Sequence, residues 1–148
     1  MKILVINGPN MNMLGRRETS IYGTTSLEGI EKLTRLKALT IGAEIDFFQS
    51  NHEGELIDRI HTAQSLGIDA FIINPGGLTH TSVSLRDALL AVGIPFIEVH
   101  LTKISSREIF RQVNYFSDIA AGSISGFGPL GYELAVEAVW NLYGKKAQ

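Results

Sequence analysis

Residues 70–92 read AFIINPGGLTHTSVSLRDALLAV. The first four residues form a short apolar run rich in isoleucine, which is typical of a buried β-strand. Asparagine, proline and paired glycines follow and predict a turn, and residues 82–92 then repeat their apolar positions at helical spacing. The stretch therefore predicts a strand, a polar turn and a helix, which is the repeating unit of α/β proteins.

The same order of elements recurs along the rest of the chain. Short apolar runs predict five buried strands, at residues 3–6, 43–48, 70–73, 95–99 and 120–124. Amphipathic stretches between and after them predict helices that include residues 27–36, 56–63, 82–92, 105–114 and 134–142. Strict alternation of strand and helix predicts a parallel sheet with helices on both faces, an open α/β sandwich. Ligands bind to such folds at the carboxyl ends of the strands, so we expect function in the turns that follow them.

Several helix boundaries carry local signals of their own. Serine or threonine followed three residues later by glutamate is the capping-box pattern, and it occurs from Thr25, from Ser50 and from Ser105. Gly42 and Gly67 are the expected stops of the first two helices.

Length, charge and composition exclude several classes of protein. A chain of 148 residues with 45% hydrophobic and 19% charged residues is expected to form one globular domain over residues 1–148. A net charge of −2 gives no reason to expect nucleic acid or an anionic membrane as a partner, and the lack of cysteine excludes disulfides and thiolate sites. The first apolar run is too short for the ~7–15 residues of a signal-peptide core, and no segment approaches the ~20 apolar residues of a membrane span. We therefore expect a cytoplasmic protein.

The turn after the first strand is unusually long. Residues 7–23 read NGPNMNMLGRRETSIYG, far beyond the roughly 2–6 residues usual for such turns. A flexible surface loop is one interpretation, and a lid over a site at about residues 15–23 is the other. In the second interpretation Tyr22 is a candidate base, because a guanidinium such as that of Arg17 lowers the pKa of a phenol from its usual ~10.

The turns after the third and fourth strands hold further polar groups. Gly76 and Gly77 allow a ligand to approach the backbone, and the helix that follows favours an anion at its start, although a tight turn with helix caps explains the same residues. Strand periodicity places Glu98 and His100 on one face at the strand end. A carboxylate keeps an imidazole oriented and protonated, so His100 is a candidate general acid, with a surface ion pair as the alternative.

Two other patterns bear on ligand binding. Arg107 and Arg111 lie one turn apart on the predicted helix 105–114, which indicates either an anionic or hydroxyl-rich partner or two solvated arginines. Residues 126–131, GFGPLG, match the dinucleotide-binding fingerprint, but the strand and acidic residue that should follow are missing, so we interpret them as a close-packed helix start at Pro129.

Together these motifs resemble the type II dehydroquinases over essentially the whole chain, from Met1 to about Tyr143. The resemblance rests on motifs in the family's order, namely Asn7-Gly8-Pro9-Asn10, Leu14-Gly15-Arg16-Arg17-Glu18, Tyr22-Gly23, Gln49-Ser50-Asn51, Glu53-Gly54, the run from Asn74 to Ser82, and Glu98-Val99-His100. It implies a flavodoxin-like fold with strand order 2-1-3-4-5, and a dodecamer built as a tetramer of trimers. It also implies conversion of 3-dehydroquinate to 3-dehydroshikimate by anti elimination through an enolate, without metal or cofactor.

The resemblance also implies roles for particular residues. Tyr22 would remove the C2 proton with its pKa lowered by Arg17, and Asn10 would hold the water that stabilises the enolate. His100, oriented by Glu98, would protonate the departing C1 hydroxyl. The residues implied to bind substrate are Asn74 and the backbone amides of Leu101 and Thr102 at the carboxylate, His80 and Arg111 at ring hydroxyls, Arg107 at the pocket wall, and Asp87, which would reach the site of a neighbouring subunit.

Three alternatives stay open on sequence alone. A phosphoacceptor signalling domain needs acidic residues after the first strand, where this chain has Asn7 and Gly8. A flavin electron carrier needs a Ser/Thr-rich phosphate loop that the first turn lacks. A lysine-dependent Schiff-base route to the same product is the third, and no lysine stands among the proposed catalytic groups.

Overall fold

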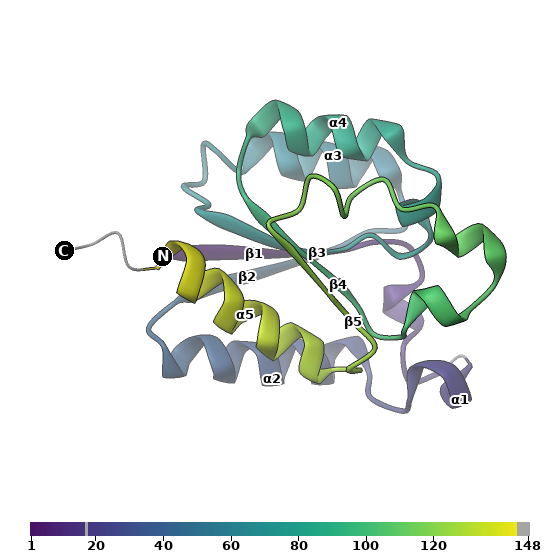
Figure 1. Ribbon diagram of the computed structural model, residues 1–148. Helices are drawn as coiled ribbons and strands as arrows, with labels where there is room; N and C mark the ends of the chain where they lie inside the picture. Colours follow the sequence, from purple (N-terminus) through teal and green to yellow (C-terminus); the bar gives the residue numbers. More distant parts are fainter. Residues whose placement is uncertain (17, 145–148) are drawn as a thin grey trace.

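The computed structural model describes residues 1–16 and 18–144, and of Thr19 and Tyr22 it describes the backbone alone. Its centre is a sheet of five parallel strands in the order β2-β1-β3-β4-β5 (Figure 1). The strands are β1 Lys2–Asn7, β2 Glu44–Gln49, β3 Ala70–Asn74, β4 Phe96–His100 and β5 Gly122–Ser125. The five predicted strands and the flavodoxin-like order are thus confirmed, whereas the predicted burial fails for the edge strands β2 and β5, which are only partly buried.

Four longer helices cover the two faces of the sheet. Helices α2 Leu27–Thr40 and α5 Leu130–Tyr143 lie on one face, and α3 Glu53–Thr62 and α4 Val83–Val92 lie on the other (Figure 1). Short elements stand at or beyond the strand ends: α1 Thr19–Tyr22 and the 3-10 helices η1 Met11–Met13, η2 Gly76–His80, η3 Ile104–Ser106 and η4 Ile109–Gln112.

The apolar side chains of β1 point alternately to the two faces of the sheet, which explains why helices pack on both faces. Ile3 and Val5 belong to the apolar cluster under α2 and α5, whereas Leu4 and Ile6 belong to the cluster under α3 and α4. All four side chains are buried, as expected of a central parallel strand. Each buried side chain of this size contributes about 1.5–3 kcal/mol to the free energy of unfolding, so β1 holds both layers to the sheet.

Two predicted capping boxes are wrong. Helix α2 is capped by Ser26, whose hydroxyl accepts a hydrogen bond from the Gly29 amide at 3.1 Å, and not by Thr25. Helix α3 starts after His52, and the Ser50 hydroxyl donates to Glu55 at 2.5 Å instead of capping the helix. The helix also ends at Thr62, earlier than the predicted stop at Gly67.

The predicted helix over residues 105–114 and its capping box from Ser105 are wrong as well. The segment forms η3 and η4, separated by Arg107 and Glu108 in extended conformations, with ψ of −156° and 148°. Arg107 and Arg111 therefore do not share one face of an α-helix. The Glu108 carboxylate lies between them, 3.6 Å from Arg107 Nε and 2.6 Å from Arg111 Nε, which offsets the like-charge repulsion that the pattern implied.

At the carboxyl edge of the sheet, the turns after β1 and β3 pack directly against each other. The Gly8 amide donates to the Asn74 carbonyl at 2.8 Å, and a Cβ at Gly8 would lie 2.3 Å from the Pro75 carbonyl oxygen. Gly76 has φ of +60°, a conformation that favours glycine. The contact brings the turn that carries Asn10 beside η2.

The glycine motif at residues 126–131 serves packing at the start of α5. A Cβ at Gly131 would lie 3.4 Å from Val99 Cγ1, so this glycine lets α5 approach β4 closely. Pro129 stands at the N-cap of the helix, and no further strand follows α5 within residues 1–16 and 18–144. A search of the same residues for a helix long and apolar enough to cross a membrane finds none.

Candidate active site

A pocket opens at the carboxyl ends of the strands, where the turns after β1, β3 and β4 meet. It encloses about 660 Å³ including its open mouth, a size suited to a small ligand. The structure brings most of the predicted site residues together in its wall: Asn10, Asn74, His80, His100, Leu101, Thr102, Arg107 and Arg111.

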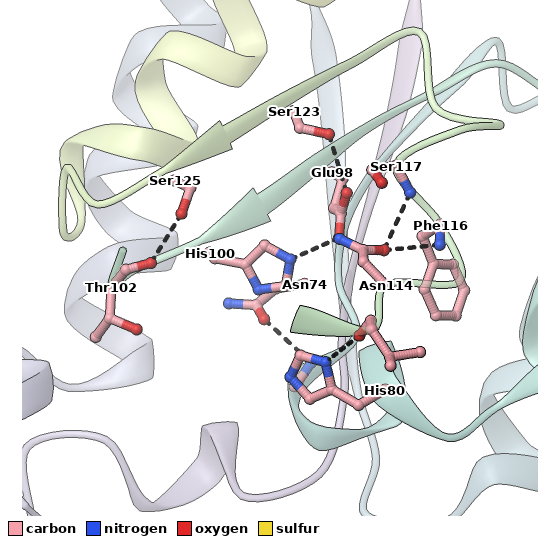
Figure 2. Close-up of polar contacts among 12 residues, drawn as sticks. Asn74, His80, Glu98, His100, Thr102, Asn114, Phe116, Ser117, Ser123 and Ser125 are labelled. Carbon is pink, nitrogen blue, oxygen red and sulfur yellow. Dashed lines mark hydrogen bonds and ion pairs between the residues drawn. The ribbon is translucent and has the colours of Figure 1, made fainter. Parts of the chain in front are cut away.

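Glu98 and His100 form a buried pair at the end of β4. Glu98 Oε1 lies 2.6 Å from His100 Nε2, and the two residues are 0% and 6% exposed (Figure 2). The spacing of two residues along a strand puts both side chains on one face, as predicted. Among the described residues Nδ1 has no hydrogen-bond partner, and the ring lines the pocket. The pair is therefore built to hold a proton donor at the pocket wall.

The Glu98 carboxylate is held by two more donors. Asn114 Nδ2 donates to its Oε1 at 2.8 Å, and the Ser123 hydroxyl donates to its Oε2 at 2.9 Å (Figure 2). Burial alone raises the pKa of the Glu98 carboxyl, but the hydrogen bond and charge of His100, with the bonds from Asn114 and Ser123, outweigh burial and hold the pKa below its usual value. The carboxylate consequently stays charged beside the His100 ring.

His80 is fixed by a contact with the chain beyond η4. Its Nδ1 lies 2.5 Å from the Val113 carbonyl oxygen (Figure 2). Because a carbonyl only accepts hydrogen bonds, Nδ1 carries the proton, and in the neutral ring Nε2 is an acceptor. His80 lines the pocket, so it is equipped to accept a hydrogen bond from a ligand hydroxyl.

Asn10 lies in a left-handed conformation, with φ of 69° and ψ of −2°. Its amide donates to Asn51 Oδ1 at 2.9 Å, and Gln49 Nε2 bonds both Asn51 Oδ1 and the Gly8 carbonyl, at 3.1 and 3.3 Å. Non-glycine residues rarely adopt this conformation, and surrounding contacts must hold them in it. Side chains at the end of β2 and just beyond it thus fix the turn after β1 at the pocket wall.

The backbone amides of Leu101 and Thr102 face away from the turn between β5 and α5. That turn binds the preceding carbonyls: the Gly126 amide donates to the His100 oxygen at 3.2 Å, and the Gly128 amide donates to the Leu101 oxygen at 2.9 Å. In a trans peptide the N–H points opposite to the C=O. The N–H groups of Leu101 and Thr102 therefore point away from the β5–α5 turn, because that turn binds the carbonyl groups of the same two peptides.

Two guanidinium groups line the pocket, with one carboxylate, that of Glu108, between them. Arg107 Nη1 lies 3.5 Å from the Thr102 hydroxyl, and Arg111 lies over the Phe110 ring at 5.1 Å while it binds Glu108. An anionic or hydroxyl-rich ligand suits this lining.

Besides the fully buried Glu98, three predicted site residues are not seen in the pocket wall. Asp87 is exposed on α4 and does not line the pocket. Arg17 and the side chain of Tyr22 lie outside the described residues, although the backbone of Tyr22 belongs to α1, at the end of the molecule where the strands terminate (Figure 1). Among the described residues no group of three or more His, Cys, Asp or Glu side chains is arranged to hold a metal ion.

The sequence did not predict the residues that form hydrogen bonds to the buried side chains of the site. Asn114, Ser123 and Tyr132 contact Glu98 or Asn74 from distant parts of the chain. No local pattern marks a single Ser, Asn or Tyr as such a partner. Gln49 and Asn51 belong to the motifs that carry the family resemblance, which implies no role for either.

Comparison with known proteins gives a consistent result. The sequence model of the family described as dehydroquinase class II matches residues 1–140. The 3-dehydroquinate dehydratase of Methylococcus capsulatus is 58% identical over 136 residues, which cover 92% of each chain. The catabolic 3-dehydroquinase 2 of Aspergillus flavus is 55% identical over 143 residues, which cover 96% of this chain and 95% of that one.

A solved structure agrees with these sequence matches. The crystal structure of the type II dehydroquinase from Butyrivibrio crossotus superposes with a TM-score of 0.92 at 43% sequence identity, covering 94% of this chain and 97% of the other.

Proposed function

This chain belongs to the class II dehydroquinase family, and we propose that it removes water from 3-dehydroquinate to give 3-dehydroshikimate, with its own side chains as base and acid. The observation that carries the proposal is the Glu98–His100 pair, a buried carboxylate and imidazole 2.6 Å apart at the wall of a pocket rich in hydrogen-bonding groups. It has the geometry of a general acid held by an orienting group.

In the first step Tyr22, as the phenolate, takes the proton from C2 beside the ketone, and the electron pair of the broken C–H bond forms an enolate. Arg17 stabilises the phenolate by its charge. Asn10 holds a water molecule against the enolate oxygen. The support for Asn10 is its place in the pocket wall and the Asn51 contact that fixes its backbone.

In the second step the enolate collapses and the C1–O bond breaks, on the face opposite to the lost proton. The C1 hydroxyl takes a proton from His100 Nδ1 and departs as water, while Glu98 stabilises the imidazolium. Tyr22 then releases its proton to the solvent and His100 Nδ1 takes one from the solvent, so both side chains return to their starting states and the net change is the loss of one water molecule.

Substrate binding uses the remaining wall of the pocket. Asn74 and the amides of Leu101 and Thr102 bind the carboxylate, and the orientation of those two peptides away from the β5–α5 turn supports this. His80 and Arg111 bind ring hydroxyls, and Arg107 shapes the mouth.

The active form is a dodecamer in the cytoplasm, a tetramer of trimers in which Asp87 of one subunit reaches a neighbouring site. The exposed position of Asp87 on α4 supports this role. Residues 15–23 act as a lid that brings Tyr22 to the substrate. Sedimentation at the mass of twelve chains is the expected result, and an active monomer would contradict the assembly.

The two steps are separated by measuring both dehydration and the exchange of the C2 hydrogen with deuterated solvent. Tyr22→Phe is expected to lose both, because the base is gone, while folding and substrate binding stay largely intact. His100→Gln is expected to lower dehydration by about 10²–10⁴-fold while C2 exchange continues. His61→Gln, an exposed histidine on α3, is the matched control and should change neither.

Near-normal dehydration by Tyr22→Phe would remove Tyr22 as the base, and near-normal dehydration by His100→Gln would remove His100 as the acid. The lysine-dependent route predicts a trapped adduct when borohydride is added with substrate. No lysine lines the pocket within the described part of the chain, so we expect no adduct.

A further inference from the structure

Three polar side chains form a hydrogen-bonded relay inside the molecule, behind the pocket. Asn74 Nδ2 lies 3.0 Å from the Tyr132 hydroxyl, and that hydroxyl lies 2.6 Å from Asn7 Oδ1. Asn7 ends β1, Asn74 ends β3 and Tyr132 belongs to α5, so the relay joins two strand ends and a helix. Tyr132 and Asn7 are 0% exposed and Asn74 is 4% exposed. Asn74 alone of the three lines the pocket.

One backbone group sets the direction of every bond in the relay. The Gly76 amide lies 3.2 Å from the side chain of Asn74 and, as a donor, requires the amide oxygen Oδ1 there. Asn74 therefore turns its NH₂ group to Tyr132, whose oxygen must accept. The single phenolic proton is then left for Asn7 Oδ1. Any other arrangement places two donors against each other.

We propose that Tyr132 is a positioning residue for substrate binding, which acts by holding the Asn74 NH₂ group so that its second hydrogen is directed at the substrate carboxylate. This inference rests on the proposed function, because it takes the carboxylate as the ligand of Asn74. Without the phenolic oxygen, the NH₂ end of Asn74 has no acceptor behind it, and Gly76 alone holds the amide.

The relay is costly to bury, which argues against a purely structural role. Burial raises the pKa of the Tyr132 phenol well above its usual value, so the hydroxyl stays protonated and remains a donor to Asn7. Asn7 Nδ2 is buried with no hydrogen-bond partner among the described residues. An unpaired buried donor costs about 1–3 kcal/mol, and an apolar residue at this strand end would avoid that cost. What Asn7 offers in return is its side-chain oxygen, which accepts the hydrogen bond from the Tyr132 hydroxyl and so completes the relay.

A double-mutant cycle tests whether Tyr132 acts through Asn74. Tyr132→Phe is expected to raise KM for 3-dehydroquinate about 3- to 10-fold, the equivalent of one net hydrogen bond, with kcat changed less than about 3-fold. In the Asn74→Ala background the same substitution should raise KM less than about 2-fold, because the group it positions is absent. An equal rise in both backgrounds, or no rise in either, would overturn the proposal.

Thr34→Val is the matched control. It also removes a buried hydroxyl under the same helical layer, where Thr34 donates to the Ile30 carbonyl at 2.7 Å within α2. It should lower the melting temperature and leave KM unchanged, which separates a loss of stability from a loss of positioning.

Two further measurements keep the test independent of the proposed function and of folding. A crystal structure of Tyr132→Phe should show the Asn74 amide rotated from its wild-type position, and an unmoved amide would contradict the relay even if the chain acts on another substrate. If Tyr132→Phe does not fold, Asn7→Leu removes the far acceptor. It should raise KM in the wild-type background and not in Asn74→Ala, and equal rises would again overturn the proposal. Failure of the wild-type chain to turn over 3-dehydroquinate counts against the proposed function alone.

Discussion

Glu98 is a charged carboxylate that is buried away from solvent. The side chain is fully buried, and it keeps its charge through the bonds from His100, Asn114 and Ser123. Removing a single partner from such a group leaves a buried charge with unmet hydrogen-bonding capacity, which costs more than an average surface change.

The lowered pKa of Glu98 predicts how stability depends on pH. A carboxyl whose folded pKa lies below its unfolded value of about 4.5 stabilises the fold above that value, and the contribution is lost as the pH falls through the folded pKa. Melting temperatures of the wild type and Glu98→Gln, measured from pH 7 down to pH 3, should therefore differ most at pH 7 and converge below about pH 4.5. A constant gap over this range would contradict the assigned charge state.

For individual residues, the sequence predicted Glu98 and His100 but not the side chains that form hydrogen bonds to Glu98. Glu98 and His100 were predictable because strand periodicity places positions two apart on one face. Asn114 and Ser123 follow Glu98 by 16 and 25 residues, and their contact with it depends on how the segment after β4 folds back. No local signal carries that information.

At the scale of elements, the strands were the most predictable part of the fold. The central strands β1 and β3 are short apolar runs that are buried almost throughout, and both match the predicted runs to within one residue at either end. The segment over residues 105–114 was not predictable, because its amphipathic pattern suits an α-helix. Its observed course depends on the contact of Glu108 with two arginines and on the Asn114 side chain, which accepts bonds from the amides of Phe116 and Ser117 (Figure 2).

The contact between the turns after β1 and β3 makes a prediction about Gly8. Gly8→Ala places a Cβ 2.3 Å from the Pro75 carbonyl oxygen, a backbone atom that cannot move without displacing the turn. We expect the two turns to separate and kcat/KM to fall at least about 10-fold, as misplacement of a site by about 1 Å can cost more.

Gly54→Ala is the control for this prediction. A Cβ at Gly54 meets nothing within 4 Å on α3, so the substitution should be neutral or stabilise the helix by up to about 1 kcal/mol. The test is to measure kcat/KM and thermal unfolding for both variants. Unchanged activity in Gly8→Ala would show that the site does not depend on close contact between the turns after β1 and β3.

At the scale of the whole molecule, the sheet order explains where the site lies. β1 and β3 are neighbours although the chain reaches them in separate βα units, and the pocket forms where their turns meet that of β4. This position at the carboxyl edge was predictable from the alternation of strands and helices. The identity of the ligand was not, because the same fold carries many different sites. For this chain the family assignment supplied it.

The most direct test of the account follows the ultraviolet absorbance of the purified protein mixed with 3-dehydroquinate, because the product 3-dehydroshikimate contains a conjugated enone. The sample is dialysed, a chelator is present and no cofactor is added. We expect a prompt rise in absorbance under these conditions. No rise from a folded and assembled sample would contradict it, and would mean that the shared family motifs serve a different ligand in this chain.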